Sequence, residues 1–491
     1  MLSIQEIKQF IDNDDASKKK QLAKIGQRYY DAEHDILQHR IFFIDADGQL
    51  QEDKTKSNVR ISHPFFTEIV DQTVQYLMSG DDAFIKSDIP ELQTELDAYF
   101  NENESFVAEL YEVITGGIVK GFEYMYAYQS KDDRLAFQSA DSLGVIKVKA
   151  KETDDHCEYV IYWFIDNIGK DNKKIKRIQV WTDRETYYYC QEDDGSIQKD
   201  VTEKINPKPH KLWKEPGVDG TLFEGFGFIP FFCFENNKRQ TSDLKPIKPL
   251  IDDYDLMNVG LSNNIQDTNE ALYVVHGFNG DNLDELMQNI KAKKHIGVDE
   301  DGGVDIKTVD IPVEARKAKM EIDEKNIYRF GSGLDTSSLK DMAATTNIAI
   351  KSAYSLLDLK TNKLKIRLKQ FLRKPVEIVL KEINERNGTD YQQKDVYFCF
   401  NPEIPTNAQE NAQIELYEAQ RKQTEINTIL NLASHLDGET SMQLICEQLD
   451  IDYDDIKEKL PVQNEPDLYN AQTALDNAPT APGSVGGGVI E

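Results

Sequence analysis

The sequence predicts an α+β chain, mostly α, and three observations lead to this fold class. Apolar residues recur three and four positions apart through residues 1–125 and again through most of the chain after 242, which is typical of amphipathic helices. Between about 126 and 235 the period changes to two, which indicates antiparallel strands. The length of 491 residues is too great for one compact core, so we expect several domains.

The N-terminal region is predicted to be helical. The segment "QLAKIGQRYYDAEHDILQHRIFF" places five apolar residues at roughly helical spacing: Leu22, Ile25, Tyr29, Ile36 and Phe43. The segment "HPFFTEIVDQTVQYLMSG" predicts a second helix, with Pro64 in its first turn and Gly80 just past its end. Residues 89–121 predict two more helices.

Four aromatic or β-branched runs predict an antiparallel sheet: "LGVIKVKAK", "CEYVIYWFI", "IKRIQVWT" and "ETYYYCQED". The proline-containing stretch 202–222 predicts an irregular loop, and 226–240 predicts a short apolar strand followed by a polar turn.

A long helix is predicted over 242–270, with its regular part beginning near Pro249 because proline is tolerated only near a first turn. Its seam is expected to be apolar, with Ile247, Leu250, Tyr254, Met257 and Leu261. The opposite face is expected to be solvated and polar, with Asp252, Asp253, Asp255, Asn263 and Asp267. Residues 271–312 then predict a small unit of strand, short helix and hairpin, before a second helix over 313–329.

The longest helical pattern covers 345–386. This segment contains ten Lys and Arg but only four Asp and Glu, and Pro375 is expected to kink the helix. The basic stretch 351–374 and the acidic stretch 252–267 could pair between subunits or within one chain. A strand is predicted within 395–407, helices over 408–460, and a mobile low-complexity tail after them.

The composition excludes several classes of protein. The net charge of −30 argues against tight DNA binding, which needs many Lys and Arg contacts to phosphate. No run approaches 18 apolar residues and no signal-peptide core is present, so we expect a soluble protein that is not exported. The five cysteines are scattered and are expected to be free thiols.

No catalytic motif emerges. The pair Ser337 and Lys340 has the spacing of a nucleophile and its base, but the companion motifs of that chemistry are missing. No phosphate-binding loop is present, and the acidic run 298–305 lacks the glycine that a calcium loop requires. Asp252, Asp253 and Asp255 could in principle hold a metal, although a solvated helix face is the favoured interpretation. We expect no cofactor and no metal.

Several segments, in their order along the chain, resemble the portal proteins of tailed bacteriophages, of the type found in long-tailed phages of Gram-positive hosts. These segments are "YYDAEHDILQHR" (29–40), "NVRISHPFFTEIVDQTVQYL" (58–77), "FIPFFCFENN" (228–237) followed by "LKPIKPLIDDYDLMNVGLSNNIQD", and "AIKSAYSLLDLKTNKLKIRLKQFL" (349–372). The resemblance covers nearly the whole chain.

The resemblance implies a structural protein without enzymatic activity, which forms a ring of about twelve subunits at one capsid vertex. Double-stranded DNA would pass through the ring during packaging and ejection, independently of its sequence. Expected partners are the terminase, head-completion or adaptor proteins, and the major capsid and scaffolding proteins, with no membrane. The expected location is the virion, and the host cytoplasm during assembly. Two alternatives remain: a metal-dependent nuclease that uses the acidic cluster, and another ring connector of the virion.

The resemblance also implies a division of the chain into parts. These are a wing (1–240), a stem helix (241–270), a clip (271–312), a second stem helix (313–330), a tunnel loop (331–346), a spine helix (347–386), a wing strand (387–407), a crown (408–460) and a flexible tail (461–491). In the tunnel loop the residues expected to face DNA are Gly331, Gly333, Thr336, Ser337, Ser338 and Lys340. In the clip the residues expected to form a docking surface are Asp284, Glu285, Lys291, Lys293 and Lys294.

Overall fold

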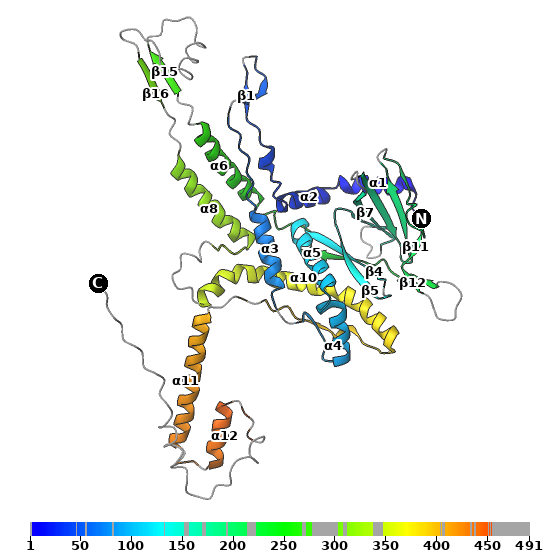
Figure 1. Cartoon of the computed structure of the whole chain (residues 1–491), viewed down its shortest axis with the longest axis vertical. Coiled ribbons are helices and arrows are strands. Elements are labelled where there is room, and N and C mark those ends of the chain that lie inside the picture. Colours follow the sequence, from blue (N-terminus) through cyan, green and yellow to red (C-terminus); the bar gives the residue numbers. More distant parts are fainter. Residues whose placement is uncertain are drawn as a thin grey trace. The chain divides into compact units, whose positions relative to one another are not determined.

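The computed structural model (Figure 1) divides into two units, Met1–Pro405 and Thr406–Glu491, and each is described by itself. The structure describes residues 2–45, 47–54, 56–80, 83–131, 133–151, 157–168, 173–192, 195–213, 222–267, 272–276, 303–307, 312–336, 347–402, 404, 408–432, 435–436, 438–449, 451 and 453.

The N-terminal region is helical over most of its length, as predicted. Its helices are α1 (Ile4–Asp15), α2 (Lys18–Tyr30), α3 (Phe65–Leu77), α4 (Pro90–Leu96), which continues into a π-helical turn (Asp97–Asn101), and α5 (Glu104–Lys120). Local capping sets two of the starts. Ser3 and Glu6 form a capping box on α1, and the Asn103 side chain accepts the backbone N–H of Phe106 at the start of α5.

Between α2 and α3 the predicted helical pattern through Phe43 is wrong. Helix α2 ends at Tyr30, and Ala32 then adopts a left-handed conformation with φ of 58°, which a helix cannot continue through. The chain instead forms a 3-10 turn and then an antiparallel hairpin. Its elements are η1 (Asp35–Gln38), β1 (Phe42–Ile44) and β2 (Leu50–Glu52).

The predicted antiparallel sheet is present and has the strand order β10-β9-β8-β7-β6, with β11 also paired to β9. Its strands are β6 (Val145–Val148), β7 (Tyr159–Ile168), β8 (Lys173–Trp181), β9 (Glu185–Gln191), β10 (Ile197–Lys199) and β11 (Lys208–Pro209). A second sheet has the order β14-β4-β5, built from β14 (Phe231–Glu235), β4 (Phe122–Gln129) and β5 (Leu135–Ala140). Helix α1 packs Ile7 and Ile11 against the first sheet.

The stretch 202–222, predicted to be an irregular loop, contains short strands. Pro209 lies in β11, a strand paired on one side only, where its missing N–H removes no ladder bond. Strand β12 (Lys211–Trp213) pairs with β13 (Leu222–Glu224).

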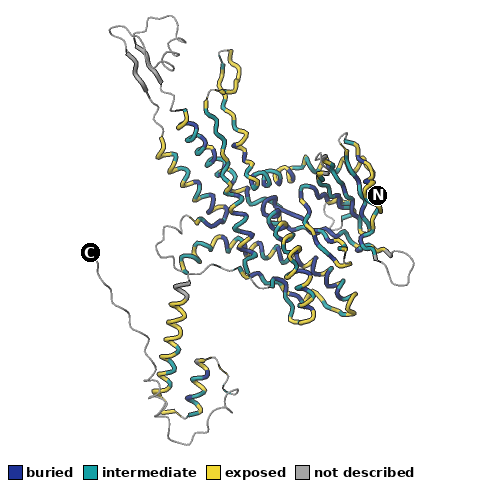
Figure 2. Tube along the Cα trace, viewed as in Figure 1, coloured by how far each residue is buried: buried dark blue, intermediate teal, exposed yellow. Residues whose placement is uncertain are grey.

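The main core gathers α3, α5 and the three-stranded sheet around the longest helix, α10 (Asn347–Asn387). Figure 2 shows this buried centre in dark blue. Helix α10 agrees with the long helix predicted over 345–386 and remains helical through Pro375. The predicted strand in 395–407 is β17 (Tyr397–Phe398), which pairs with β3 (Ile85–Lys86).

The helices predicted over 242–270 and 313–329 are α6 (Lys248–Asp267) and α8 (Val313–Gly331), which lie side by side. Between them in sequence, β15 (Leu272–His276) pairs with β16 (Gly303–Lys307), in agreement with the strands predicted there. The short helix predicted from residue 282 lies outside the described residues.

The predicted faces of α6 are wrong in part. Of the predicted apolar seam, Ile247 is buried just before the helix, and Leu250 and Tyr254 pack against the core. The fully buried residues of the helix itself lie outside that seam: Ile251, Asp255, Val259 and Asn263. The helix turns this partly polar face inward because a segment distant in sequence covers it with hydrogen-bonding groups.

The second unit contains the predicted helices α11 (Ala408–Leu432) and α12 (Gly438–Gln448), which pack on each other. The tail after residue 453 lies outside the described residues.

Candidate functional site

Residues 29–63, which connect α2 to α3 and include the hairpin, run along the polar face of α6. We call them the hairpin segment. At its two ends it meets the same carboxylate. His34 Nδ1 lies 2.6 Å from Asp255 Oδ2, and His63 Nδ1 lies 2.7 Å from Asp255 Oδ1. The backbone N–H of His63 also donates to Asp255 Oδ1 at 3.1 Å. Both carboxylate oxygens of Asp255 therefore have hydrogen-bond partners, and the residue is fully buried. The prediction that Asp255 is solvated is wrong.

Further along α6 two more side chains bind the backbone of the hairpin segment. Asn263 Oδ1 accepts the N–H of Val59 at 2.7 Å, and Asp267 Oδ1 accepts the N–H of Ser57 at 3.0 Å. Asn263 and Asp267, one helical turn apart, thus fix the position of the hairpin segment along α6.

Near the start of α6, the contact between this helix and the hairpin segment is ionic. Tyr29 donates its hydroxyl to Asp252, and Lys248 Nζ lies 2.7 Å from both Asp252 Oδ2 and Asp35 Oδ2. Burial, together with the bond to Asp252, raises the pKa of Tyr29 well above its usual range. Burial opposes ionisation of Asp35, but hydrogen bonds from Lys248 and Arg28 outweigh it and lower its pKa to about 2.

The three acids of the predicted cluster point to different partners. Asp253 pairs with Lys319 of α8, whereas Asp252 and Asp255 bind the hairpin segment. Within the described part of the chain, no group of three or more His, Cys, Asp or Glu is placed to hold a metal ion. The lysine partners of Asp252 and Asp253 belong to α6 and α8, and not to the basic stretch of α10.

The start of the predicted tunnel loop is anchored. Helix α8 ends with Ser332 in a left-handed conformation, φ 56° and ψ 36°, and Gly333 N–H donates to the Tyr328 carbonyl at 2.9 Å. Gln72 of α3 then bonds both backbone groups of Leu334, at 2.8 Å to its N–H and 3.1 Å to its carbonyl. Lys360 of α10 reaches the carbonyl of Gly331 at 3.2 Å.

The two glycines of this loop serve close packing. A Cβ on Gly331 would lie 2.8 Å from Ile69 Cδ1, and a Cβ on Gly333 would lie 2.7 Å from Ile69 Cγ1. Both glycines are buried, and Thr336 is exposed. The other predicted loop residues, Ser337, Ser338 and Lys340, lie outside the described residues, as do the predicted clip residues Asp284, Glu285, Lys291, Lys293 and Lys294.

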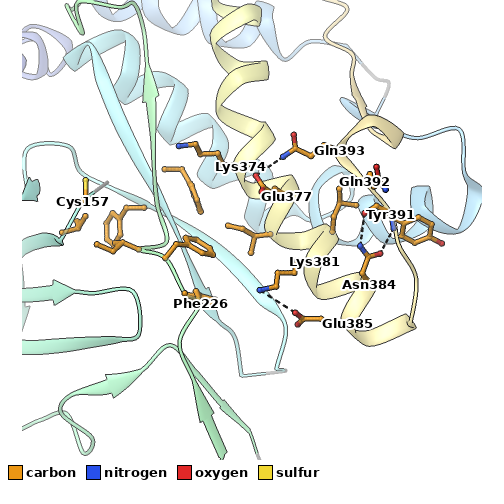
Figure 3. Close-up of a pocket in the computed structure, with 18 of the residues that line it drawn as sticks. Cys157, Phe226, Lys374, Glu377, Lys381, Asn384, Glu385, Tyr391, Gln392 and Gln393 are labelled. Carbon is orange, nitrogen blue, oxygen red and sulfur yellow. Dashed lines mark hydrogen bonds and ion pairs between the residues drawn. The ribbon is translucent and has the colours of Figure 1, made fainter. Parts of the chain in front are cut away.

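A pocket of about 1040 Å³, which sequence reasoning missed, lies between α10 and the strands around Phe226 (Figure 3). Its polar groups largely bind one another. Gln393 Nε2 donates to Glu377 at 3.0 Å, and Asn384 exchanges two hydrogen bonds with the backbone of Tyr391, at 2.8 and 2.9 Å. These contacts stabilise the turn after α10. No sequence motif predicted the pocket, because its walls come from segments about 150 residues apart.

The polar groups brought together here hold elements of the chain in fixed register. Within the described ranges, no helix is both long and apolar enough to cross a membrane. The family of phage portal proteins described as SPP1 Gp6-like matches residues 8–452. The chain belongs to this family.

Two relatives agree with this assignment. The portal protein of Bacillus phage SPP1 is 31% identical over 354 residues, which is 71% of this chain and 67% of the relative. The portal protein of Clostridium phage phiCD119 is 22% identical over 389 residues, which is 74% of this chain and 80% of the relative. The prediction of a phage portal protein is thus confirmed, and the protein is a structural component of the virion, not a nuclease.

Proposed function

We propose that the protein forms a closed ring of about twelve subunits at one capsid vertex. Double-stranded DNA passes through the ring during packaging and ejection. The observation that carries this proposal is the family match over residues 8–452, which spans nearly every described element.

The parts of the ring follow the order of elements. Residues 1–240 and 387–407 form the wing. Residues 241–270 and 313–330, which contain α6 and nearly all of α8, form the stem, and 271–312 form the clip. Residues 347–386 form the spine, 408–460 the crown, and 461–491 the tail, which lies outside the described residues. The side-by-side packing of α6 and α8, with a strand pair between them in sequence, supports the stem and clip. The division of the chain after residue 405 supports a separate crown.

Residues 331–346 form the tunnel loop that lies against DNA. The anchoring of residues 331–334 to α3 and α10 supports this assignment, because a loop that meets moving DNA needs a fixed base. Gly331 and Gly333 form that base, and Thr336, Ser337, Ser338 and Lys340 offer sequence-independent contacts to phosphate. The net charge of −30 keeps the duplex free to slide.

The partners are those that a DNA conduit needs: the terminase, the head-completion or adaptor proteins, and the major capsid and scaffolding proteins. The clip residues Asp284, Glu285, Lys291, Lys293 and Lys294 form part of the surface for terminase and adaptors. Assembly takes place in the host cytoplasm.

Native mass spectrometry and negative-stain electron microscopy of the purified full chain test the ring. The expected result is a closed particle of about twelve chains with a central hole. A compact dimer or monomer over the whole concentration range, also in the presence of capsid and scaffolding proteins, would overturn the proposal.

A further inference from the structure

The basic residues of α10 fall into two groups. Some form ion pairs with carboxylates of the same chain: Lys360–Asp243, Lys381–Glu385 and Arg386–Glu95. Lys369 and Arg373, one helical turn apart on the same helix, have no carboxylate partner among the described residues. In a chain with a net charge of −30, basic side chains that find no acid to pair with point to an anion from outside the chain.

Both side chains line a pocket of about 440 Å³ between α10 and the segment that follows it. The turn η4 (Gln393–Asp395) and strand β17 complete the lining and supply Lys394 and Tyr397. Val376 and Val396, which are buried, also contribute to it. None of the described residues that line this pocket is Asp or Glu. The pocket therefore gathers three basic side chains and no acidic one.

Hydrogen bonds fix the shape of the pocket. The Gln393 side chain donates to the carbonyl of Arg373 at 3.4 Å and to Glu377 at 3.0 Å, which holds η4 against α10; Figure 3 shows the second of these bonds. Two acids close by in the structure are bound to other donors, Glu377 to Gln393 and Asp88 to the hydroxyl of Tyr397 at 3.1 Å. Neither of them neutralises the basic side chains of the pocket.

The charge and the size of the pocket indicate a class of ligand. A phosphate group carries about two negative charges and three acceptor oxygens, so it matches several basic side chains better than a single carboxylate does. The volume exceeds that of a phosphate group and lies within the range of about 300–1,000 Å³ that is usual for small-molecule sites. The ring of Tyr397 is 46% exposed and offers a face on which a planar base can stack.

We propose that this pocket binds a mononucleotide, with its phosphate group on Lys369, Arg373 and Lys394 and its base against Tyr397. The guanidinium of Arg373 is suited to two phosphate oxygens at once, because its donors form a planar fork. This inference goes beyond the proposed function and does not depend on the ring, since all of these residues belong to one chain.

Calorimetric titration of the full chain with AMP, at about 0.15 M salt to screen weak surface attraction, tests the site. AMP should bind saturably, about tenfold or more tightly than either inorganic phosphate or adenosine, because only AMP makes both kinds of contact. Absence of saturable AMP binding would overturn the proposal. Tighter binding of hexaglutamate than of AMP would also overturn it, and would assign the pocket to an acidic protein segment.

Charge reversal locates the binding on α10. Lys369→Glu with Arg373→Glu should weaken AMP binding by about tenfold or more, because it replaces attraction by repulsion. The matched control, Lys351→Glu with Lys363→Glu, makes the same change of charge at exposed residues of α10 that do not line the pocket, and should weaken binding less than about twofold. Equal weakening by the two pairs would show a general attraction of anions to this helix and overturn the proposal.

A third variant tests the stacking contact without changing the charge. Tyr397→Leu should weaken the binding of AMP and leave that of inorganic phosphate unchanged, because phosphate does not contact the ring. Equal affinity of this variant and the native chain for AMP would remove Tyr397 from the site and contradict the assignment of a nucleotide. All of these titrations are read per chain, so a failure of the proposed ring would leave their outcome unaffected.

Discussion

Helices α5 and α6 belong to one unit but are held by different kinds of contact. Helix α5 buries Val113, Ile114 and Ile118 in the apolar core. Helix α6 buries Asp255 and Asn263 as well as Ile251 and Val259, and both polar side chains bind the hairpin segment. Apolar burial stabilises in proportion to area, whereas a buried hydrogen bond fixes position and destabilises strongly when one partner is lost. The apolar core around α5 therefore provides stability, whereas the polar contacts of α6 fix the position of the hairpin segment along that helix.

The largest expected effect lies in the apolar region. Phe234 is fully buried, packs edge-on against Phe371 at 5.8 Å, and fits closely against Gly117. Phe234→Ala should lower the free energy of unfolding by about 3–5 kcal/mol, measured by denaturant titration. Phe43→Ala, at a side chain 48% exposed, is the control and should change it little. Equal effects would contradict the placement of the core.

The next effect tests the polar region. Asp255→Ala removes the acceptor of two histidines, one of them fully buried, and should destabilise by about 3 kcal/mol. Hydrogen exchange should rise in residues 34–63 more than in α5. Unchanged protection of the hairpin segment would show that these bonds do not hold it.

A third effect concerns a buried histidine among aromatic rings. His210 stacks on Phe226 with ring centroids 5.1 Å apart, and burial lowers its pKa to about 4 despite the opposing charge of Asp183. The unfolded chain then binds more protons between about pH 4 and 6.5, so stability is complete above 6.5 and falls as the pH drops. The loss should reach about 2 kcal/mol at pH 5.

Denaturant titrations at pH 7 and pH 5 measure this loss, and the variant His210→Gln should show a smaller dependence on pH. A dependence equal to that of the native chain would assign the effect to other groups.

The smallest effect is expected at an exposed ion pair between α6 and α8. Asp253 and Lys319 have side chains 39% and 42% exposed, so Asp253→Asn should change stability by less than about 1 kcal/mol. A loss as large as that of Asp255→Ala would remove the distinction between buried and exposed acids on α6.

Sequence reasoning succeeded where a local pattern determines the element. The apolar periods of α3, α5 and α10 and the alternation of β7 and β8 follow from burial of one face, which can be recognised from the residues alone. The start of α6 near Pro249 was also predicted from a local feature, because proline is tolerated only near the first turn of a helix.

It failed where contacts are distant in sequence. Asp255 appeared to be a solvated acid because its partners, His34 and His63, lie 221 and 192 residues away. The hairpin was missed because strands of three residues carry too little pattern to outweigh a helical spacing. Gly331 and Gly333 were predicted to belong to the tunnel loop. Their close approach to Ile69 of α3 could not be predicted, because it depends on tertiary packing.

A cryo-electron microscopy map of the assembled full chain tests the central claim most directly. We expect a closed ring in which α6 and α8 run along the central channel and residues 331–336 lie at its wall. A ring with these helices on its outer rim, or a particle without a channel, would contradict the account.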